Sequence, residues 1–140
     1  MEKIILEREI DKGDFSKAGE ASSKLKQLLR KLGVKPAIIR KLSIISYELE
    51  INIIIHSVGG KIKAKATPDN IIITASDNGP GIADVNKAFQ PGFSTASDEI
   101  RELGFGAGMG LNNIKKYSDE LAVETAVGEG TEIEARISLK

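Results

Sequence analysis

Three polar side chains recur at four-residue intervals in an otherwise apolar stretch: Glu48, Asn52 and His56. If this stretch is a helix, residues four apart lie one turn from each other on one face. A carboxylate beside the core costs free energy unless it is paired or takes part in chemistry. Glu48 could therefore orient or deprotonate a nucleophile, and the amide oxygen of Asn52 suits a hard cation such as Mg²⁺. His56 is interpreted as a structural residue at the helix end.

Glu50 lies between Glu48 and Asn52 in the sequence. On the same helix its side chain would point roughly to the opposite side from theirs, because a helix turns once in 3.6 residues. We therefore expect Glu50 to be a solvated charge outside the candidate site.

A second candidate is Asp77, which opens the segment Asp77-Asn78-Gly79-Pro80-Gly81 after an apolar run. Such a segment is often an ordinary turn. A hairpin turn, however, needs a strand immediately after it, and residues 82–85 do not continue one; Pro80 also lacks the N–H that a strand ladder needs. An aspartate at the end of a buried strand could instead accept a hydrogen bond from an exocyclic amine such as that of adenine.

A third candidate is the glycine cluster from Gly104 to Gly110, which precedes a stretch of helical pattern. Its spacing does not fit the dinucleotide motif G-x-G-x-x-G, and no Walker A motif occurs in the chain. A glycine loop that leads into a helix presents free N–H groups and the positive end of the helix dipole to phosphates. A flexible surface loop is the alternative, and the cluster alone does not decide between the two.

Hydrophobic periodicity indicates the elements of the N-terminal half that must position these residues. Residues 4–10 alternate, with Ile4 and Leu6 on the side opposite the charged residues, which is typical of a strand with one solvated face. A helix is then expected to begin at an Asp14 N-cap, to include Ala18 and to end at Gly33. A second helix is predicted from Pro36 to about His56, with Gly59-Gly60 as the break after it.

The C-terminal half is predicted to consist of two hairpins and one helix. Residues 61–67 and 71–75 read as strands joined by a Pro68-Asp69-Asn70 turn, and residues 121–125 and 131–137 as a second pair. Residues 111–117 read as a helix, and residues 77–110 have no sustained periodicity, which is usually a sign of function. The fold predicted is a single α+β domain over residues 1–140: a two-layer sandwich with a mixed, mostly antiparallel sheet covered by helices on one face.

Composition excludes several function classes. The chain has 140 residues, with 20 Lys and Arg balancing 20 Asp and Glu, so it lacks the basic excess of nucleic-acid-binding proteins. The absence of cysteine excludes disulfides and thiolate metal sites, and a single histidine disfavours a zinc site. No apolar run has the length of a membrane span, and no signal-peptide pattern is present. We expect a cytoplasmic protein that binds neither nucleic acid nor membrane.

The three candidate segments, in this order, resemble the boxes of the GHKL ATPase superfamily, which has the Bergerat or histidine-kinase-like fold. The E-x-x-x-N of its N box is matched by Glu48 and Asn52, and the D-x-G-x-G of its first glycine box by the segment that begins at Asp77. The segment 104–110 matches the second glycine box, and Gly130-Thr131 a late Gly-Thr pair of the adenine pocket. The resemblance implies that ATP lies between the sheet, the N-box helix and a lid.

The same resemblance implies roles for individual residues. Glu48 would be the general base, or would position a protein serine hydroxyl; Asn52 would hold Mg²⁺, and Asp77 would bind the adenine amine. Residues from about 86 to 105 would form the ATP lid. The nucleotide-binding set implied is Asn52, Asp77, Gly79, Gly81, Ile82, Gly104, Gly106, Ala107, Gly108, Met109, Gly110, Leu111 and Thr131.

Within the superfamily the chain looks like the anti-sigma-factor serine/threonine kinases and the switch kinases of bacterial stress signalling. This likeness rests on the length of the chain, on segment 89–95 and on the end of the second glycine cluster. Some anti-sigma kinases have an arginine immediately before a Ser-Gly-Met-Gly box. Here Gly106-Ala107 stand before Gly108 and the nearest arginine is Arg101, so the chain looks closer to the switch-kinase branch. Whether Arg101 reaches a γ-phosphate or a partner is left open by the sequence.

The function implied is that of an ATP- and Mg²⁺-dependent kinase which phosphorylates a serine or threonine of a small STAS-type antagonist protein. The alternative is a nucleotide-dependent binding module that sequesters a sigma factor or activates a phosphatase. A homodimer is a further expectation. The kinase domain of a two-component histidine kinase is disfavoured, because His56 lies on the N-box helix and no phosphoacceptor helix bundle comes before the first strand.

Overall fold

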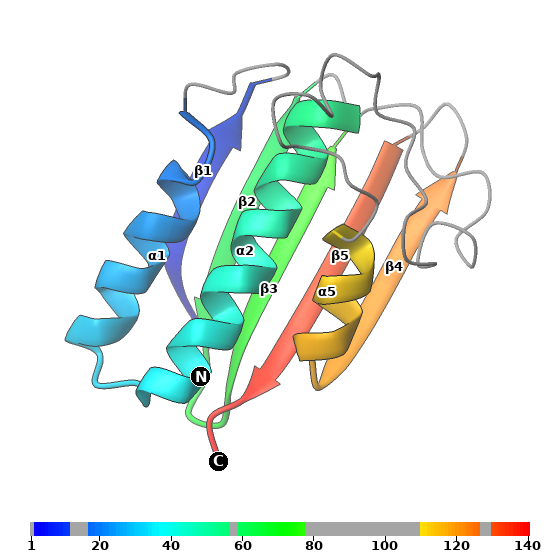
Figure 1. Cartoon of the computed structure of the whole chain (residues 1–140). Coiled ribbons are helices and arrows are strands. Elements are labelled where there is room, and N and C mark those ends of the chain that lie inside the picture. Colours follow the sequence, from blue (N-terminus) through cyan, green and yellow to red (C-terminus); the bar gives the residue numbers. More distant parts are fainter. Residues whose placement is uncertain (1, 12–16, 57–58, 78–109, 127–129) are drawn as a thin grey trace.

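The computed structural model describes residues 2–11, 17–56, 59–77, 110–126 and 130–140. Its elements are the strands β1 (Lys3–Ile10), β2 (Gly60–Ala66), β3 (Asn70–Asp77), β4 (Glu120–Ala126) and β5 (Gly130–Ser138), and the helices α1 (Glu20–Lys31), α2 (Pro36–His56) and α5 (Gly110–Tyr117). The three helices lie side by side on one face of the sheet, with α2 between α1 and α5 (Figure 1). The predicted two-layer α+β sandwich is confirmed.

The strands form one sheet in the order β1-β2-β3-β5-β4. All four pairings between the described strands are antiparallel, so the expectation of a mostly antiparallel sheet holds and no parallel pair is seen among them. The β2–β3 hairpin turns where predicted, and Thr67 stabilises the turn because its hydroxyl oxygen accepts hydrogen bonds from the amides of Asp69 and Asn70. The predicted β4–β5 hairpin is present as well.

β1 departs from simple alternation. The pairing with β2 shifts register between Ile4 and Leu6, which leaves Ile5 as an extra residue in a β-bulge. The bulge reverses the face on which the preceding residue lies, so Ile4 is 51% exposed while Leu6 and Ile10 join the core. The prediction that Ile4 and Leu6 share the inner face is therefore wrong at Ile4.

The helix boundaries follow local chemistry at most ends. α1 stops at a Schellman motif, in which Gly33 has a φ of 76° and the amides of Gly33 and Val34 bond to the carbonyls of Arg30 and Leu29. α2 begins with Pro36 at its first position, as expected. α1, however, begins at Glu20, not near Asp14; Asp14 lies outside the described residues, and Ala18 precedes the helix.

The core lies between the helices and the inner face of the sheet. α2 contributes the most residues to it, and β3 and β5 pair at the centre of the sheet beneath. The largest fully buried side chains are Leu25, Leu29, Leu42, Ile45, Leu49, Ile53, Ile62, Ile71, Ile73, Ile114, Ile133 and Ile137. Within the described residues, no helix has the length and apolar character needed to cross a membrane.

Candidate functional site

The sequence-predicted residues converge on one end of the sandwich. The C-terminal ends of α2 and β3 and the start of β5 lie at this end, at the top of Figure 1, and α5 begins lower, with its first residue toward this end. Asn52 is one helical turn nearer to it than Glu48, and Asp77 is the last residue of β3. Residues from four separate segments of the chain are thus brought together, as a site built from loops and element ends requires.

Glu48 lies half-buried on the side of α2 that faces α5. Asn113, on α5, lies close to its carboxylate. Burial raises the pKa of Glu48 above its usual value, and the nearby Asn113 side chain opposes part of this rise because it stabilises the ionised form. The Glu48 carboxylate can act as a base, because its oxygens have lone pairs that can accept a proton.

Asn52 is half-buried one turn further along α2. In the described part of the chain no three histidine or acidic side chains gather closely enough to hold a metal ion. A cation at Asn52 would therefore take most of its ligands from phosphate oxygens and water. This suits Mg²⁺, which is usually held by few protein oxygens together with substrate phosphates.

Asp77 and Thr131 are direct cross-strand partners at the site end of the sheet. They continue the alternation of the buried residues Ala75 and Ile133, so both lie on the face that the helices cover. Thr131 is only 7% exposed, and its hydroxyl oxygen lies 2.9 Å from that of Thr125 on β4. A carboxylate and two hydroxyls thus form a polar row at the edge of an apolar core.

Gly60 supports the position of Asp77 from the other side. It pairs with Asp77 in the β2–β3 ladder, and a Cβ atom at Gly60 would collide with the carbonyl oxygen of Ser76 and lie 3.0 Å from the Cβ of Asp77. Only glycine lets the two strands approach this closely. Sequence reasoning interpreted Gly60 merely as part of a break after α2, whereas it is the first residue of β2.

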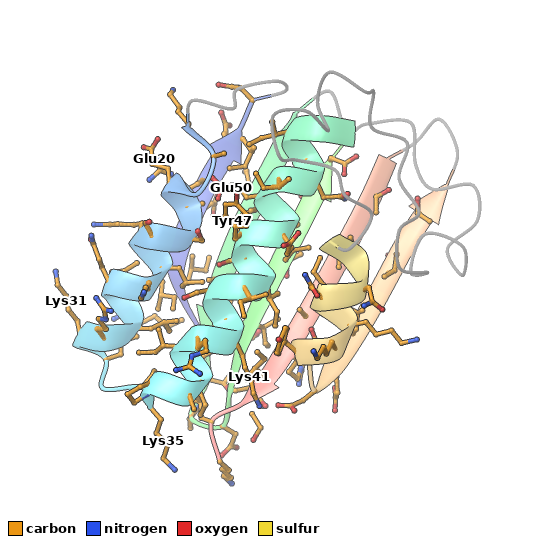
Figure 2. The ribbon with its side chains drawn as sticks, viewed as in Figure 1. Glu20, Lys31, Lys35, Lys41, Tyr47 and Glu50 are labelled. Carbon is orange, nitrogen blue, oxygen red and sulfur yellow. The ribbon has the colours of Figure 1, made fainter. Side chains whose placement is uncertain are left out.

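Glu50 contradicts its sequence prediction. It is only 2% exposed, and its carboxylate accepts hydrogen bonds from the backbone amides of Gly19 (3.1 Å) and Ala21 (3.2 Å), at the start of α1. Burial raises the pKa of Glu50, while these bonds, one from the Ser22 amide and the nearby Arg8 charge lower it. Figure 2 shows Glu50 in the space between α1 and α2, beside Tyr47. Glu50 therefore caps α1 from a neighbouring helix.

This cap explains why the start of α1 was mispredicted. Gly19 occupies the N-cap with a φ of 90° and has no side chain to cap with, so the acceptor comes from α2. A signal was present in the sequence: α2 is apolar on nearly all sides, which predicts a buried helix, and a buried carboxylate must find partners.

Much of the predicted nucleotide set lies outside the described residues. This holds for Gly79, Gly81, Ile82, Gly104, Gly106, Ala107, Gly108 and Met109, for the predicted lid at 86–105 and for Arg101. Gly110 and Leu111 are described as the first two residues of α5, and His56 as the last of α2. The roles assigned to all these residues stay predictions.

Comparison with known proteins gives a family and several relatives. Residues 38–140 match the family described as Histidine kinase-, DNA gyrase B-, and HSP90-like ATPase. The chain is 37% identical over 92 residues to the serine/threonine-protein kinase RsbT of Bacillus subtilis, a match that covers 63% of each chain. It is 41% identical over 85 residues to the anti-sigma F factor of Thermoanaerobacter sp., covering 57% of this chain and 56% of that one. The matches thus span less than two thirds of these relatives.

Two solved structures share the fold. One is the SiaB-SiaC complex from Pseudomonas aeruginosa, with a TM-score of 0.66, 16% identity, and coverage of 96% of this chain and 89% of that one. The other is the mycobacterial sensor histidine kinase MprB, with a TM-score of 0.54, 17% identity, and coverage of 95% and 97%. Because the family match covers well over half of the residues, from α2 to the C-terminal strand, the chain belongs to the family of histidine kinase-, DNA gyrase B- and HSP90-like ATPases.

Proposed function

We propose that the chain is an ATP-dependent protein serine/threonine kinase of the anti-sigma-factor or switch-kinase type. The observation that carries this proposal is the half-buried Glu48 carboxylate, placed one turn before Asn52 on α2 in a chain of an ATPase family. The names of two relatives support it, since one is a serine/threonine-protein kinase and the other an anti-sigma F factor.

The nucleotide would lie at the site end of the sandwich. Asp77 accepts the hydrogen bond of the adenine amine there, with Thr131 beside it in the sheet. Asn52 supplies one oxygen to Mg²⁺, and the segment that ends at Gly110 supplies backbone N–H groups to the phosphates. ATP supplies the phosphoryl group. The protein mainly positions the reactants and stabilises the charge of the transition state, as is usual in phosphoryl transfer.

Glu48 takes the proton of the attacking serine or threonine hydroxyl in this proposal. Its burial makes it a stronger base than an exposed carboxylate, because burial raises its pKa. Because its pKa is raised, Glu48 is protonated, and stops acting as a base, at a higher pH than an exposed glutamate. As the pH is lowered, the rate of transfer should therefore begin to fall at a higher pH than it would with an exposed glutamate as the base.

The partner we propose is a small STAS-type antagonist protein whose serine or threonine is phosphorylated. An alternative follows from the relative named anti-sigma F factor: nucleotide-dependent sequestration of a sigma factor, or activation of a phosphatase, without kinase activity as the main role. A cytoplasmic location and a homodimer complete the proposal.

Transfer of labelled phosphate from Mg-ATP to recombinant STAS-domain proteins tests the kinase proposal. Glu48→Gln keeps the shape of the side chain and removes the base, and should slow transfer by about 10²- to 10⁴-fold. The matched control is Glu124→Gln, which alters an exposed carboxylate on β4 and should transfer normally. Equal partner binding by wild type and Glu48→Gln, with no phosphorylation by either, would favour the binding module instead.

A further inference from the structure

Residues 20–41 hold a strong excess of positive charge. They contain seven lysines and arginines and one acidic residue, Glu20, which pairs with Arg8 at 2.9 Å, whereas the whole chain has 20 basic and 20 acidic side chains. All seven basic side chains are exposed, and they lie on α1, at the α1–α2 connection and on the first two turns of α2. We call them the basic helix surface: Lys24, Lys26, Arg30, Lys31, Lys35, Arg40 and Lys41.

The lysines of the sheet are in a different situation. On β2, Lys61, Lys63 and Lys65 each have a glutamate carboxylate of β1 or of the residue before it within 4.0 Å. In the described part of the chain, no carboxylate forms an ion pair with any member of the basic helix surface. The fold thus neutralises the positive charges of β2 internally and leaves those of the two helices available to another molecule.

The stability of the helices does not explain these charges. Lys26 and Arg30 are four residues apart on α1, a spacing at which like charges repel. Lys35 immediately precedes α2, near the positive end of the helix dipole, and the first turn of this helix, all of which the structure describes, contains no acidic side chain. Only Arg30 and Lys31, in the last turn of α1, lie where the dipole stabilises a cation. A role in binding accounts for the remaining charges.

An exposed leucine lies within the basic helix surface. Leu32, at the C-cap of α1, is 57% exposed, and Ile4 on β1 is the only other large apolar side chain in the described residues that is exposed to this degree. Lys31 precedes Leu32 in the chain, and Lys35 follows it three residues later. An apolar centre with a charged rim is the usual arrangement of a protein–protein contact surface.

We propose that the basic helix surface docks a protein that presents a cluster of aspartate and glutamate side chains around an apolar residue. Leu32 contacts the apolar residue, and the lysines and arginines pair with the carboxylates. Figure 2 shows Lys31, Lys35 and Lys41 toward one end of the two helices, and the proposed nucleotide site lies at the other. Roughly 25 Å of helix, at about 1.5 Å per residue, separates Lys35 from Asn52. The partner can therefore bind while the nucleotide site is occupied.

Two other classes of anionic partner fit this surface less well. Nucleic acid favours proteins with a net positive charge, and this chain is neutral, so that its other segments carry an acidic excess that a polyanion repels. Helices that lie on anionic membranes insert a broad apolar face, whereas the apolar face of α1 is used in the core, through Leu25 and Leu29. A protein partner needs only a local match of charge and an apolar contact.

Fluorescence anisotropy of a labelled peptide that contains only glutamate and leucine tests the charge of the surface. The triple variant Lys31→Gln, Lys35→Gln, Lys41→Gln should bind this peptide about tenfold to hundredfold more weakly than wild type at low salt, because three surface ion pairs are lost. The matched control is the same substitution at the three paired lysines of β2, which removes equal charge and should bind like wild type. Thermal unfolding shows that both variants are folded.

The apolar contact is tested separately. Leu32→Ser should weaken binding of the glutamate–leucine peptide about tenfold, because the leucine no longer buries apolar surface against the peptide. The same variant should bind polyglutamate, which has no apolar side chain, as wild type does. Added salt should weaken the binding of both peptides, since it screens exposed ion pairs.

The results that would overturn the docking surface are specific. They are no binding of the glutamate–leucine peptide by wild type at low salt, unchanged affinity in the triple variant, or an equal loss in the β2 control. Tighter binding to duplex DNA or to phosphatidylglycerol vesicles than to the peptide, lost in the triple variant, would overturn the choice of a protein partner. None of these measurements involves phosphoryl transfer, so the docking surface and the kinase proposal can fail independently.

Discussion

Glu48 and Glu50 are two residues apart on α2, and their side chains lie on opposite sides of this helix, in different surroundings. Glu50 points toward α1, where the backbone amides of Gly19 and Ala21 bind its carboxylate. Glu48 lies on the side of α2 that faces α5, close to Asn113. Burial raises the pKa of both groups, so burial alone does not tell them apart.

The two carboxylates differ in whether they remain accessible for a reaction. Several amides of a helix start satisfy the Glu50 carboxylate, and the side chain is closed off from solvent at 2% exposure. Glu48 is only half-buried on the side of α2 that faces α5, and among the described residues no backbone amide is identified as its partner. We therefore interpret Glu50, which is fully buried and bound by backbone amides, as a structural residue, and Glu48 as the candidate base.

The largest effect on stability is expected from Glu50→Ala. The substitution leaves the amides at the start of α1 buried without an acceptor, at a cost of about 3 kcal/mol in the free energy of unfolding. Glu48→Ala is the matched control, since it removes the same group from the same helix where it is half-exposed, and should cost much less. Urea denaturation measures both, and equal losses would remove the distinction between the two sides of α2.

A smaller effect, on binding, is expected from Asp77→Asn. The amide can turn its oxygen to the adenine amine but loses the charge that strengthens the bond, so ATP affinity should fall about tenfold. The control is Asp69→Asn, at the opposite end of the β2–β3 hairpin, which should bind ATP normally. Isothermal titration calorimetry measures the ATP affinity of both variants. Unchanged affinity in Asp77→Asn would contradict the assignment of Asp77 to the adenine pocket.

The smallest effect is expected from pH. Because the folded pKa of Glu50 lies above its unfolded value, the folded chain binds more protons than the unfolded chain between these two values. Its contribution to the free energy of unfolding therefore increases as pH falls through this window and decreases as pH rises. Glu50→Gln, which does not titrate, should have a flatter stability profile below neutral pH than wild type. Parallel profiles, measured by urea denaturation across pH, would contradict the assignment.

The sequence predicts most of the helices and strands because the glycine, proline and turn residues at their ends act locally. Gly33 and Pro36 place the α1–α2 connection, and the Pro68-Asp69-Asn70 turn places the first hairpin. The bulge at Ile5 and the start of α1 are missed, because the first depends on pairing with β2 and the second on a carboxylate 29 residues away from Ala21.

The candidate site divides in the same way. Glu48, Asn52 and Asp77 can be found from spacing, since each lies in a short pattern with its own chemistry. Gly60 cannot, because it acts through its neighbour in the adjacent strand. The residues proposed to do chemistry carry local signals, whereas a residue that supports their position depends on the assembled fold.

Single-turnover phosphoryl transfer by Glu48→Gln and Glu50→Gln, compared at a temperature where both are folded, tests the central claim most directly. We expect Glu48→Gln to lose about 10²- to 10⁴-fold in rate with little change in Tm. We expect Glu50→Gln to lose Tm while its folded population transfers phosphate at close to the wild-type rate. Normal transfer by Glu48→Gln, or a greater loss of rate in Glu50→Gln, would contradict the assignment of chemistry to one side of α2 and structure to the other.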